Sequence, residues 1–291
     1  MRSVNTDGGV NLQFKLLSAI GIIIIVSGHC YHGGMELAYN WFPPYSYNLA
    51  LFVFISGYFY KTNYEENVGK YIWKRTKRLL IPAYLWNIFY GGMVAFLGLF
   101  GFTIGAKPDL YNLFVMPFVD GEAFQYNLGS WFVYPLFLVC IINVLFRKFL
   151  KLIHLDNEFI VLIVYLAIGM IGINTALENP TAINGIVKLL VRTMFFLPCY
   201  EFGRFYKAVL EKKDTLNNVA YFAIIFAVQL ILLTFCKDLE YTPSSFTKFN
   251  NGFIIPYISS ITAIAFWLRV SRLLVPVSYT HLRAHETRGN L

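Results

Sequence analysis

Long apolar runs separated by short polar segments make up most of this chain. A run of about 17–25 apolar residues is long enough to cross a membrane as a helix. Runs of this kind fall at 14–31, 45–60, 79–103, 130–149, 159–175, 185–205, 219–236 and 253–270. The pattern predicts an all-α, polytopic membrane bundle of about eight transmembrane helices. The second run, Tyr45 to Tyr60, is short and needs flanking residues or a locally thin membrane to span.

Composition supports this fold class. The 291 residues are 57% hydrophobic and 14% charged, whereas soluble domains carry about 25% charged residues. A soluble core has no room for this excess of apolar side chains, so composition excludes a soluble domain.

The basic residues alternate along the chain, and this predicts the topology. Most lie between runs two and three, four and five, and six and seven, or after run eight, and they include Lys61, Arg147, Lys148, Lys151, Arg204, Lys207, Lys212, Arg269 and Arg272. The alternate loops hold only Lys107, Lys188, Lys237 and Lys248. Because cytoplasmic loops carry the excess of Lys and Arg, we expect a cytoplasmic N-terminus in the plasma membrane. The net charge of +8 then indicates topology and contact with membrane lipids, and no nucleic-acid partner is expected.

His29 closes the first apolar run and is the main candidate for chemistry. An ionisable side chain in a membrane segment is costly and is usually kept for a function. Histidine also moves protons near neutral pH more readily than other side chains. The alternative is a histidine at the membrane interface that hydrogen-bonds to water or lipid headgroups. The charge pattern places His29 towards the outer face.

Three further patterns follow His29. Ser56 and Gly57 give the second helix a small polar step, either for close helix packing or for a ligand. Arg75 and Arg78 are spaced i, i+3 at the start of the third helix, so we expect them to share a face there. Two guanidinium groups at that position would hold phosphates, or they would simply anchor the helix. Trp131 opens the fourth helix and is by default an interfacial aromatic.

Two ionisable residues lie inside the sixth run. Arg192 and Glu201 are nine residues apart, which is two and a half helical turns, so they cannot easily pair with each other. We expect each to face a cavity or a partner helix, although Glu201 is close enough to the helix end to be interfacial. His32 shares a face with His29, but further ligands are lacking nearby and no metal site is predicted.

Taken in order, these elements resemble the membrane-bound acyltransferase-3 family, which O-acylates bacterial surface sugars and other acceptors. In that family a first helix ends in a catalytic His, and a Ser-Gly-aromatic element follows in helix two. The motif R-x-x-R-L-x-x-P begins helix three, here from Arg75 to Pro82, and a later helix opens with W-F. The resemblance covers about residues 12–275.

The resemblance implies a bacterial membrane O-acetyltransferase that moves acetyl from acetyl-CoA, or another acyl group from its acyl-CoA, to a hydroxyl of a cell-envelope sugar or polysaccharide. His29 would be the acyl-transfer base, and Arg75 and Arg78 would lie by the acyl-CoA donor. The family usually has Arg or Lys eleven residues before the His. Here that position is Ser18, and Lys15, one turn earlier on nearly the same face, is expected to substitute for it. The alternative class is a multi-pass transporter or polysaccharide exporter, in which His29, Arg192 and Glu201 would line a permeation path.

The segment 276–291 differs from the rest. Its composition changes abruptly to polar, and it resembles translated adapter sequence of the kind found at the ends of proteins predicted from assembled reads. We therefore predict an incomplete membrane acyltransferase domain at 1–275 and a non-native tail at 276–291. An intact family member has about ten membrane helices. A genuine polar tail is the alternative.

Overall fold

The computed structural model describes residues 5–6, 10–30, 41–102, 105, 107–236, 238–239 and 251–288. For residues 5, 6, 10, 29, 30 and 276–288 it describes the backbone alone. Nearly all of the described chain that is regular is helical, which confirms the predicted all-α class. A two-residue antiparallel ladder, β1 (Asn5–Thr6) with β2 (Val10–Asn11), precedes the first helix.

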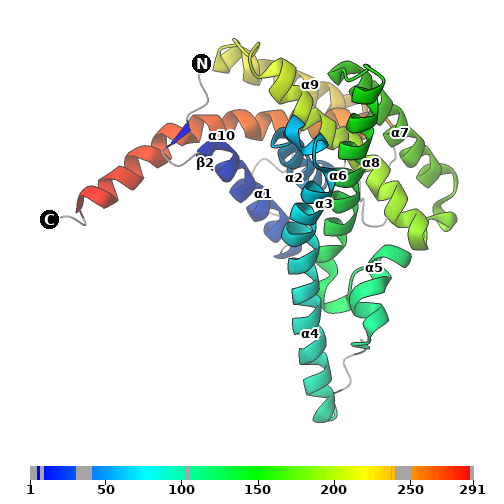
Figure 1. Cartoon of the computed structure of the whole chain (residues 1–291). Coiled ribbons are helices and arrows are strands. Elements are labelled where there is room, and N and C mark those ends of the chain that lie inside the picture. Colours follow the sequence, from blue (N-terminus) through cyan, green and yellow to red (C-terminus); the bar gives the residue numbers. More distant parts are fainter. Residues whose placement is uncertain are drawn as a thin grey trace.

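Each of the eight predicted runs contains a helix of the structure (Figure 1). These helices are α1 (Leu12–Cys30), α2 (Asn48–Tyr58), α4 (Ile81–Leu99), α6 (Val133–Leu152), α7 (Glu158–Glu178), α8 (Gly185–Phe205), α9 (Asn218–Phe235) and α10 (Ile255–Arg288). The backbone of α10 continues as a helix from the last predicted run into the predicted tail. The short second run is an eleven-residue helix, about 16 Å long at 1.5 Å per residue.

Shorter helical pieces connect these helices. They are η1 (Pro44–Ser46), η2 (Thr62–Glu65), α3 (Val68–Arg75), η3 (Thr76–Leu80), η4 (Tyr111–Val115), α5 (Met116–Val119), η5 (Gln125–Phe132), η6 (Pro180–Ala182) and η7 (Tyr206–Leu210). Of these, η3, η4 and η7 are π-helical turns. Such turns are often found at functional sites.

Five segments of the described chain are long and apolar enough to cross a membrane. They are 68–99, 125–152, 158–178, 218–235 and 255–275. The first is the continuous run of α3, η3 and α4. Helices α1 and α2 are apolar but shorter, and α8 is long but contains Lys188, Arg192, Glu201 and Arg204. These features fit a membrane bundle in which α8 is the internal helix.

Two glycines allow α2 and α8 to cross in direct backbone contact. A Cβ on Gly57 would lie 1.8 Å from the carbonyl oxygen of Tyr200, and a Cβ on Gly203 would lie 1.9 Å from that of Phe54. Small residues permit this kind of approach between membrane helices. Phe195, Cys199 and Tyr200 of α8 are fully buried, so α8 lies at the centre of the core.

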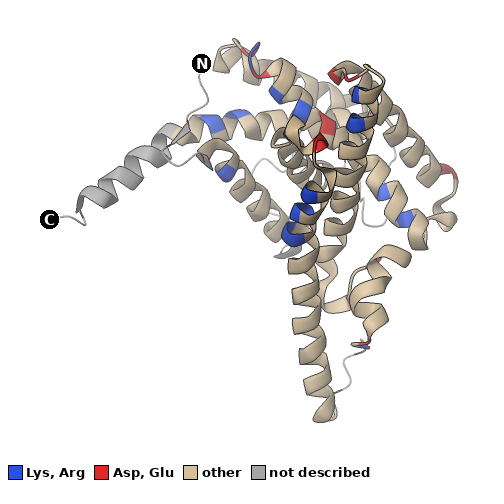
Figure 2. Cartoon of the chain, in the orientation of Figure 1, with Lys and Arg blue, Asp and Glu red and all other residues tan. Residues whose placement is uncertain are grey.

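Helix α4 has a different environment. It projects from the rest of the bundle in Figure 1, and its lower part contains no Lys, Arg, Asp or Glu (Figure 2). Leu85, Phe89 and Phe96 are 60%, 58% and 58% exposed. An apolar helix with this much exposed apolar surface fits contact with lipid chains.

The loops predicted to be basic meet at one end of the bundle, which we call the basic end. Tyr58 at the end of α2 donates a hydrogen bond to Glu211 after η7, at 2.9 Å. Arg269 of α10 pairs with Asp214 at 2.6 Å, and Lys151 of α6 lies 3.9 Å from Glu65 of η2. The loops that the sequence marks as basic therefore lie on a common side of the bundle. Of the residues assigned to the alternate loops, Lys237 and Lys248 lie outside the described part of the chain.

Candidate active site

His29 lies in the last turn of α1, at the end of the bundle opposite the basic end. Phe14, near the start of α1, stacks on Tyr58 of α2 with ring centroids 3.9 Å apart. At the other end of the helix, the hydroxyl of Tyr45 donates to the carbonyl of Gly28 at 3.1 Å. The backbone of His29 is thereby fixed beside the segment that precedes α2. Its side chain, like the whole of His32, lies outside the described residues.

Lys15 lies at the opposite end of α1 from His29. Fourteen residues of helix separate the two, which is about 21 Å. Lys15 is exposed and, with Ser18 and Phe59, lines an open groove at the basic end. The hydroxyl of Ser18 donates to the carbonyl of Phe14 at 2.8 Å. Lys15 therefore lies at the basic end of the bundle, and His29 lies at the opposite end.

Tyr200 of α8 connects two of the sequence patterns, the Ser56–Gly57 step and the arginine pair that begins with Arg75. Gly57 packs on the carbonyl of Tyr200. The hydroxyl of Tyr200 lies 3.5 Å from that of Tyr71, and Tyr71 accepts a hydrogen bond from Nε of Arg75 at 3.0 Å. The Oγ atom of Ser56 is 3.9 Å from Sγ of the buried Cys140. Gly57 therefore serves helix packing, and Arg75 is turned towards the interior.

The expectation that Arg75 and Arg78 share one face is wrong. Arg75 is half-buried against Tyr71, with its guanidinium 5.1 Å from the ring centroid, whereas Arg78 is exposed. The reason is local: the chain leaves the α-helix at Arg75 and enters the π-helical turn η3. A π-turn holds more residues than an α-turn, so residues three apart are rotated further from each other.

Arg192 and Trp131 lie together, at the same end of the bundle as His29. The guanidinium of Arg192 lies 4.4 Å from the ring centroid of Trp131, a cation–π contact. Arg192 is 1% exposed and donates to the carbonyl of Gly121 in the loop before α6. Trp131 lies in η5, which runs directly into α6 at Val133 within the membrane-crossing segment 125–152. Arg192 was expected to face a cavity or a partner helix; in the structure it contacts an aromatic ring and a loop carbonyl.

Glu201 is fully buried and faces a partner helix. Its carboxylate accepts hydrogen bonds from Arg147 of α6 at 2.7 and 2.8 Å. Arg147 also contacts Glu158 at 2.6 Å and Asp156 at 3.2 Å, and Arg204 contacts Glu158 at 2.8 Å. We call these five residues the ionic cluster. It joins α6, α7 and α8 close to the basic end.

The ionic cluster corrects the sequence analysis at Arg147 and Arg204. Both were counted as loop cations, yet Arg147 is 0% exposed and Arg204 is buried. Each lies inside a helix and within its apolar run, Arg147 two residues and Arg204 one residue before the end of that run. That position was the available signal, because a loop cation needs no place within an apolar run.

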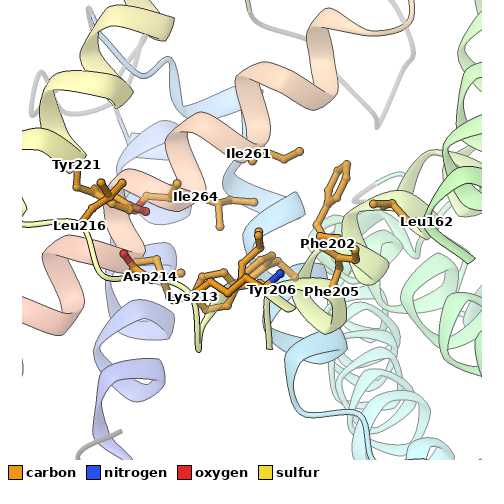
Figure 3. A pocket seen from close by; sticks show the side chains of 14 residues that line it. Leu162, Phe202, Phe205, Tyr206, Lys213, Asp214, Leu216, Tyr221, Ile261 and Ile264 are labelled. Carbon is orange, nitrogen blue, oxygen red and sulfur yellow. The ribbon is translucent and has the colours of Figure 1, made fainter. Parts of the chain in front are cut away.

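An apolar cavity of about 450 Å³ lies near the basic end. Side chains of α2, α7, α8, η7, α9 and α10 line it, among them Phe202, Tyr206, Tyr221 and Ile264 (Figure 3). Lys213 and Asp214 are its charged members, and Asp214 is already paired with Arg269 and Arg272. The cavity therefore suits an apolar group.

Comparison with protein families decides the affiliation of the chain. The acyltransferase domain of the acyltransferase-3 type matches residues 11–279. The chain belongs to the membrane acyltransferase-3 family. No curated protein and no solved structure matches it significantly. The family resemblance of the ordered motifs is thus confirmed, and with it the assignment of the chain as a membrane-bound acyltransferase.

Proposed function

We propose that this acyltransferase transfers acetyl from acetyl-CoA to a hydroxyl of a cell-envelope sugar or polysaccharide in the bacterial plasma membrane. The observation that carries the proposal is the family match over residues 11–279, in a chain whose first helix ends at a histidine. The basic end would face the cytoplasm, where positive loops are retained. His29 would then lie towards the outer face, where a cell-envelope acceptor arrives.

In the proposed reaction, His29 acts as a general base. The acceptor hydroxyl oxygen attacks the thioester carbonyl carbon while a neutral imidazole nitrogen of His29 takes the hydroxyl proton. The C–S bond then breaks, an acetyl ester forms, and coenzyme A leaves as a thiol after receiving that proton. Base catalysis of this kind typically contributes about 10²–10⁴-fold to the rate.

The donor and the base approach the bundle from different ends. Lys15 and Arg75 lie towards the basic end, and Arg192 with Trp131 lies at the end of His29. In the proposed arrangement, Lys15 and Arg75 attract the donor, and the arginine–tryptophan pair positions the acceptor. Arg78 is exposed and contributes only long-range attraction. The acyl group then has to travel about the length of α1, either on the pantetheine arm or by relay.

Substitution of His29 tests the proposal. We expect His29→Ala and His29→Gln to lower acetyl transfer at least about 100-fold, because the attacking hydroxyl loses its base. The measurement is acceptor-dependent release of coenzyme A thiol by protein purified in lipid nanodiscs. His154→Asn is a matched control, since His154 is exposed and has a φ of 57°, a conformation that Asn tolerates.

The outcome is informative in both directions. Loss of transfer in both His29 variants, with normal yield and activity of the His154 variant, supports the proposal. Near-normal transfer by either His29 variant would contradict the role of His29. Absence of acetyl-CoA binding and turnover in the unmodified chain would contradict acyl transfer itself.

A further inference from the structure

A polar cavity of about 660 Å³ opens at the basic end, on the side of η7 away from the apolar cavity. Residues 60–63, at the entry to η2, form one part of its lining. The end of α8 with η7 and the residues after it forms another, and Glu158 of α7 completes it. We call it the polar cavity. Three loops predicted to be on one side of the membrane therefore contribute to a single site.

Three cations of the polar cavity have no carboxylate partner among the residues that the structure describes. Lys61, Lys207 and Lys212 are exposed and line it. None of the three forms an ion pair with a carboxylate in the described part of the chain. The ammonium group of Lys207 lies 5.2 Å from the ring centroid of Tyr58, which is a contact with a neutral group.

The two carboxylates of the polar cavity already have partners. Glu158 pairs with Arg147 and with Arg204. Glu211 accepts the Tyr58 hydroxyl at 2.9 and 3.1 Å. Glu211 keeps its negative charge, but neither carboxylate forms an ion pair with the three lysines in the described part of the chain. The ammonium groups of these lysines are therefore available to a ligand.

Glu158, Arg204 and Tyr60, which also line the polar cavity, are joined to one another by hydrogen bonds and a ring contact. Nε of Arg204 donates to both carboxylate oxygens of Glu158, at 3.2 and 3.0 Å, and its guanidinium lies 4.9 Å from the ring centroid of Tyr60. The hydroxyl of Tyr60 donates to Glu65 at 3.2 Å. A cavity lined by three exposed lysines beside this hydrogen-bonded group fits a ligand that carries several phosphates.

We infer that the polar cavity binds the phosphate groups of the acyl-CoA donor through Lys61, Lys207 and Lys212. This inference rests on the proposed function, since it places part of the proposed donor. The separation of Arg75 from Arg78 supports it, because these arginines do not form one phosphate clamp. The apolar cavity does not compete, since its lysine, Lys213, stands beside Asp214.

The test is a charge-neutralised triple variant, Lys61→Gln, Lys207→Gln and Lys212→Gln. Its control carries the same charge change outside the polar cavity, Lys70→Gln, Lys148→Gln and Lys213→Gln, all of which are exposed. Equilibrium binding of acetyl-CoA and of phosphate-free acetyl-pantetheine is measured for both variants in phosphatidylcholine nanodiscs. We expect the first variant to bind acetyl-CoA at least about tenfold more weakly than the control, a loss of roughly 1.4 kcal/mol, and acetyl-pantetheine equally well.

The contrary outcomes separate this inference from the proposed function. Equal acetyl-CoA binding by the two triple variants would overturn the assignment of the polar cavity and leave the proposed function standing. Absence of acetyl-CoA binding by the unmodified chain would overturn both. A second arm uses nanodiscs with phosphatidylglycerol. If the first variant loses retention of this lipid while its acetyl-CoA affinity matches the control, the cavity belongs to a lipid headgroup and the donor assignment fails.

Discussion

At the scale of single residues, Arg147 shows how this bundle accommodates a buried charge. Its side chain is 0% exposed and contacts carboxylates of Glu201, Glu158 and Asp156. A charge in a low-dielectric interior is tolerated only when it is paired and hydrogen-bonded. The two most buried members of the ionic cluster, Arg147 and Glu201, therefore depend on each other.

Removing one partner of this pair should be more harmful than removing both. We expect Glu201→Leu to destabilise the protein by about 3–5 kcal/mol, because Arg147 loses its buried counter-charge. The double variant Arg147→Met, Glu201→Leu should recover much of that stability. Thermal unfolding in detergent, followed by intrinsic tryptophan fluorescence, gives the order of the midpoints.

Asp156 provides a control for the same arginine, because its side chain is 26% exposed. Asp156→Asn should shift the midpoint far less than Glu201→Leu, since exposed ion pairs contribute about 0–1 kcal/mol. A double variant that is less stable than Glu201→Leu alone would show that Arg147 does not depend on Glu201.

At the scale of elements, the crossing of α2 and α8 organises the bundle. Gly57 and Gly203 each pack on a backbone carbonyl of the other helix. The same crossing holds Tyr200 against α2, and Tyr200 in turn contacts Tyr71, which receives Arg75. The position of Arg75 thus depends on Gly57 and Gly203, because only glycine allows the two helices to approach this closely.

Adding one methyl group at this crossing should be costly. We expect Gly57→Ala and Gly203→Ala to lower the yield of folded protein and the unfolding midpoint, because the new Cβ would overlap a backbone oxygen. Size-exclusion chromatography and thermal unfolding measure both effects. Gly92→Ala in α4 is the matched control, since nothing lies within 4 Å of its added Cβ.

The control should change in the other direction or not at all. Alanine is favoured over glycine in a helix by roughly 0.5–1 kcal/mol. If Gly57→Ala were as stable as Gly92→Ala, the backbone contact between α2 and α8 would not exist at the described distance.

At the scale of the whole molecule, charge divides the bundle into two ends. Contacts such as Tyr58 with Glu211 and Arg269 with Asp214 join loops that are far apart in sequence. We propose that this basic end faces the cytoplasm. The proposal has a direct test that does not depend on activity.

Single cysteines should report the two sides. In a background without the native cysteines, a membrane-impermeant maleimide should label Lys107→Cys in intact cells, because its loop is on the far side from the basic end. Lys213→Cys should react only after permeabilisation, since it lies in the basic loop between α8 and α9. The opposite labelling pattern would contradict a cytoplasmic basic end.

The sequence was sufficient for features that depend on local pattern. Run length and hydropathy predicted where each of the eight helices lies, because a membrane helix satisfies its backbone within one segment. The shortness of α2 was visible in the same way. The alternation of basic residues also anticipated which loops meet at one end.

Features that depend on distant partners could not be predicted. Arg147 meets Glu201 across 54 residues, and Trp131 meets Arg192 from a different element. No local spacing encodes either contact. The separation of Arg75 and Arg78 was missed because their spacing was interpreted for an α-helix, and the π-turn η3 changes the rotation per residue.

The ionic cluster also has a consequence for biosynthesis. A charged side chain near the centre of an inserting helix costs about 2.5–3.5 kcal/mol. Helix α8 carries Arg192 near its middle and Glu201 about one turn before its end. On its own, α8 would be a poor substrate for the translocon. Glu201 pairs with Arg147 of α6, and Arg204 of α8 pairs with Glu158 of α7. Both α6 and α7 leave the ribosome before α8. We therefore expect α6 and α7 to remain at the translocon until α8 has been synthesised. The three helices would then enter the bilayer together.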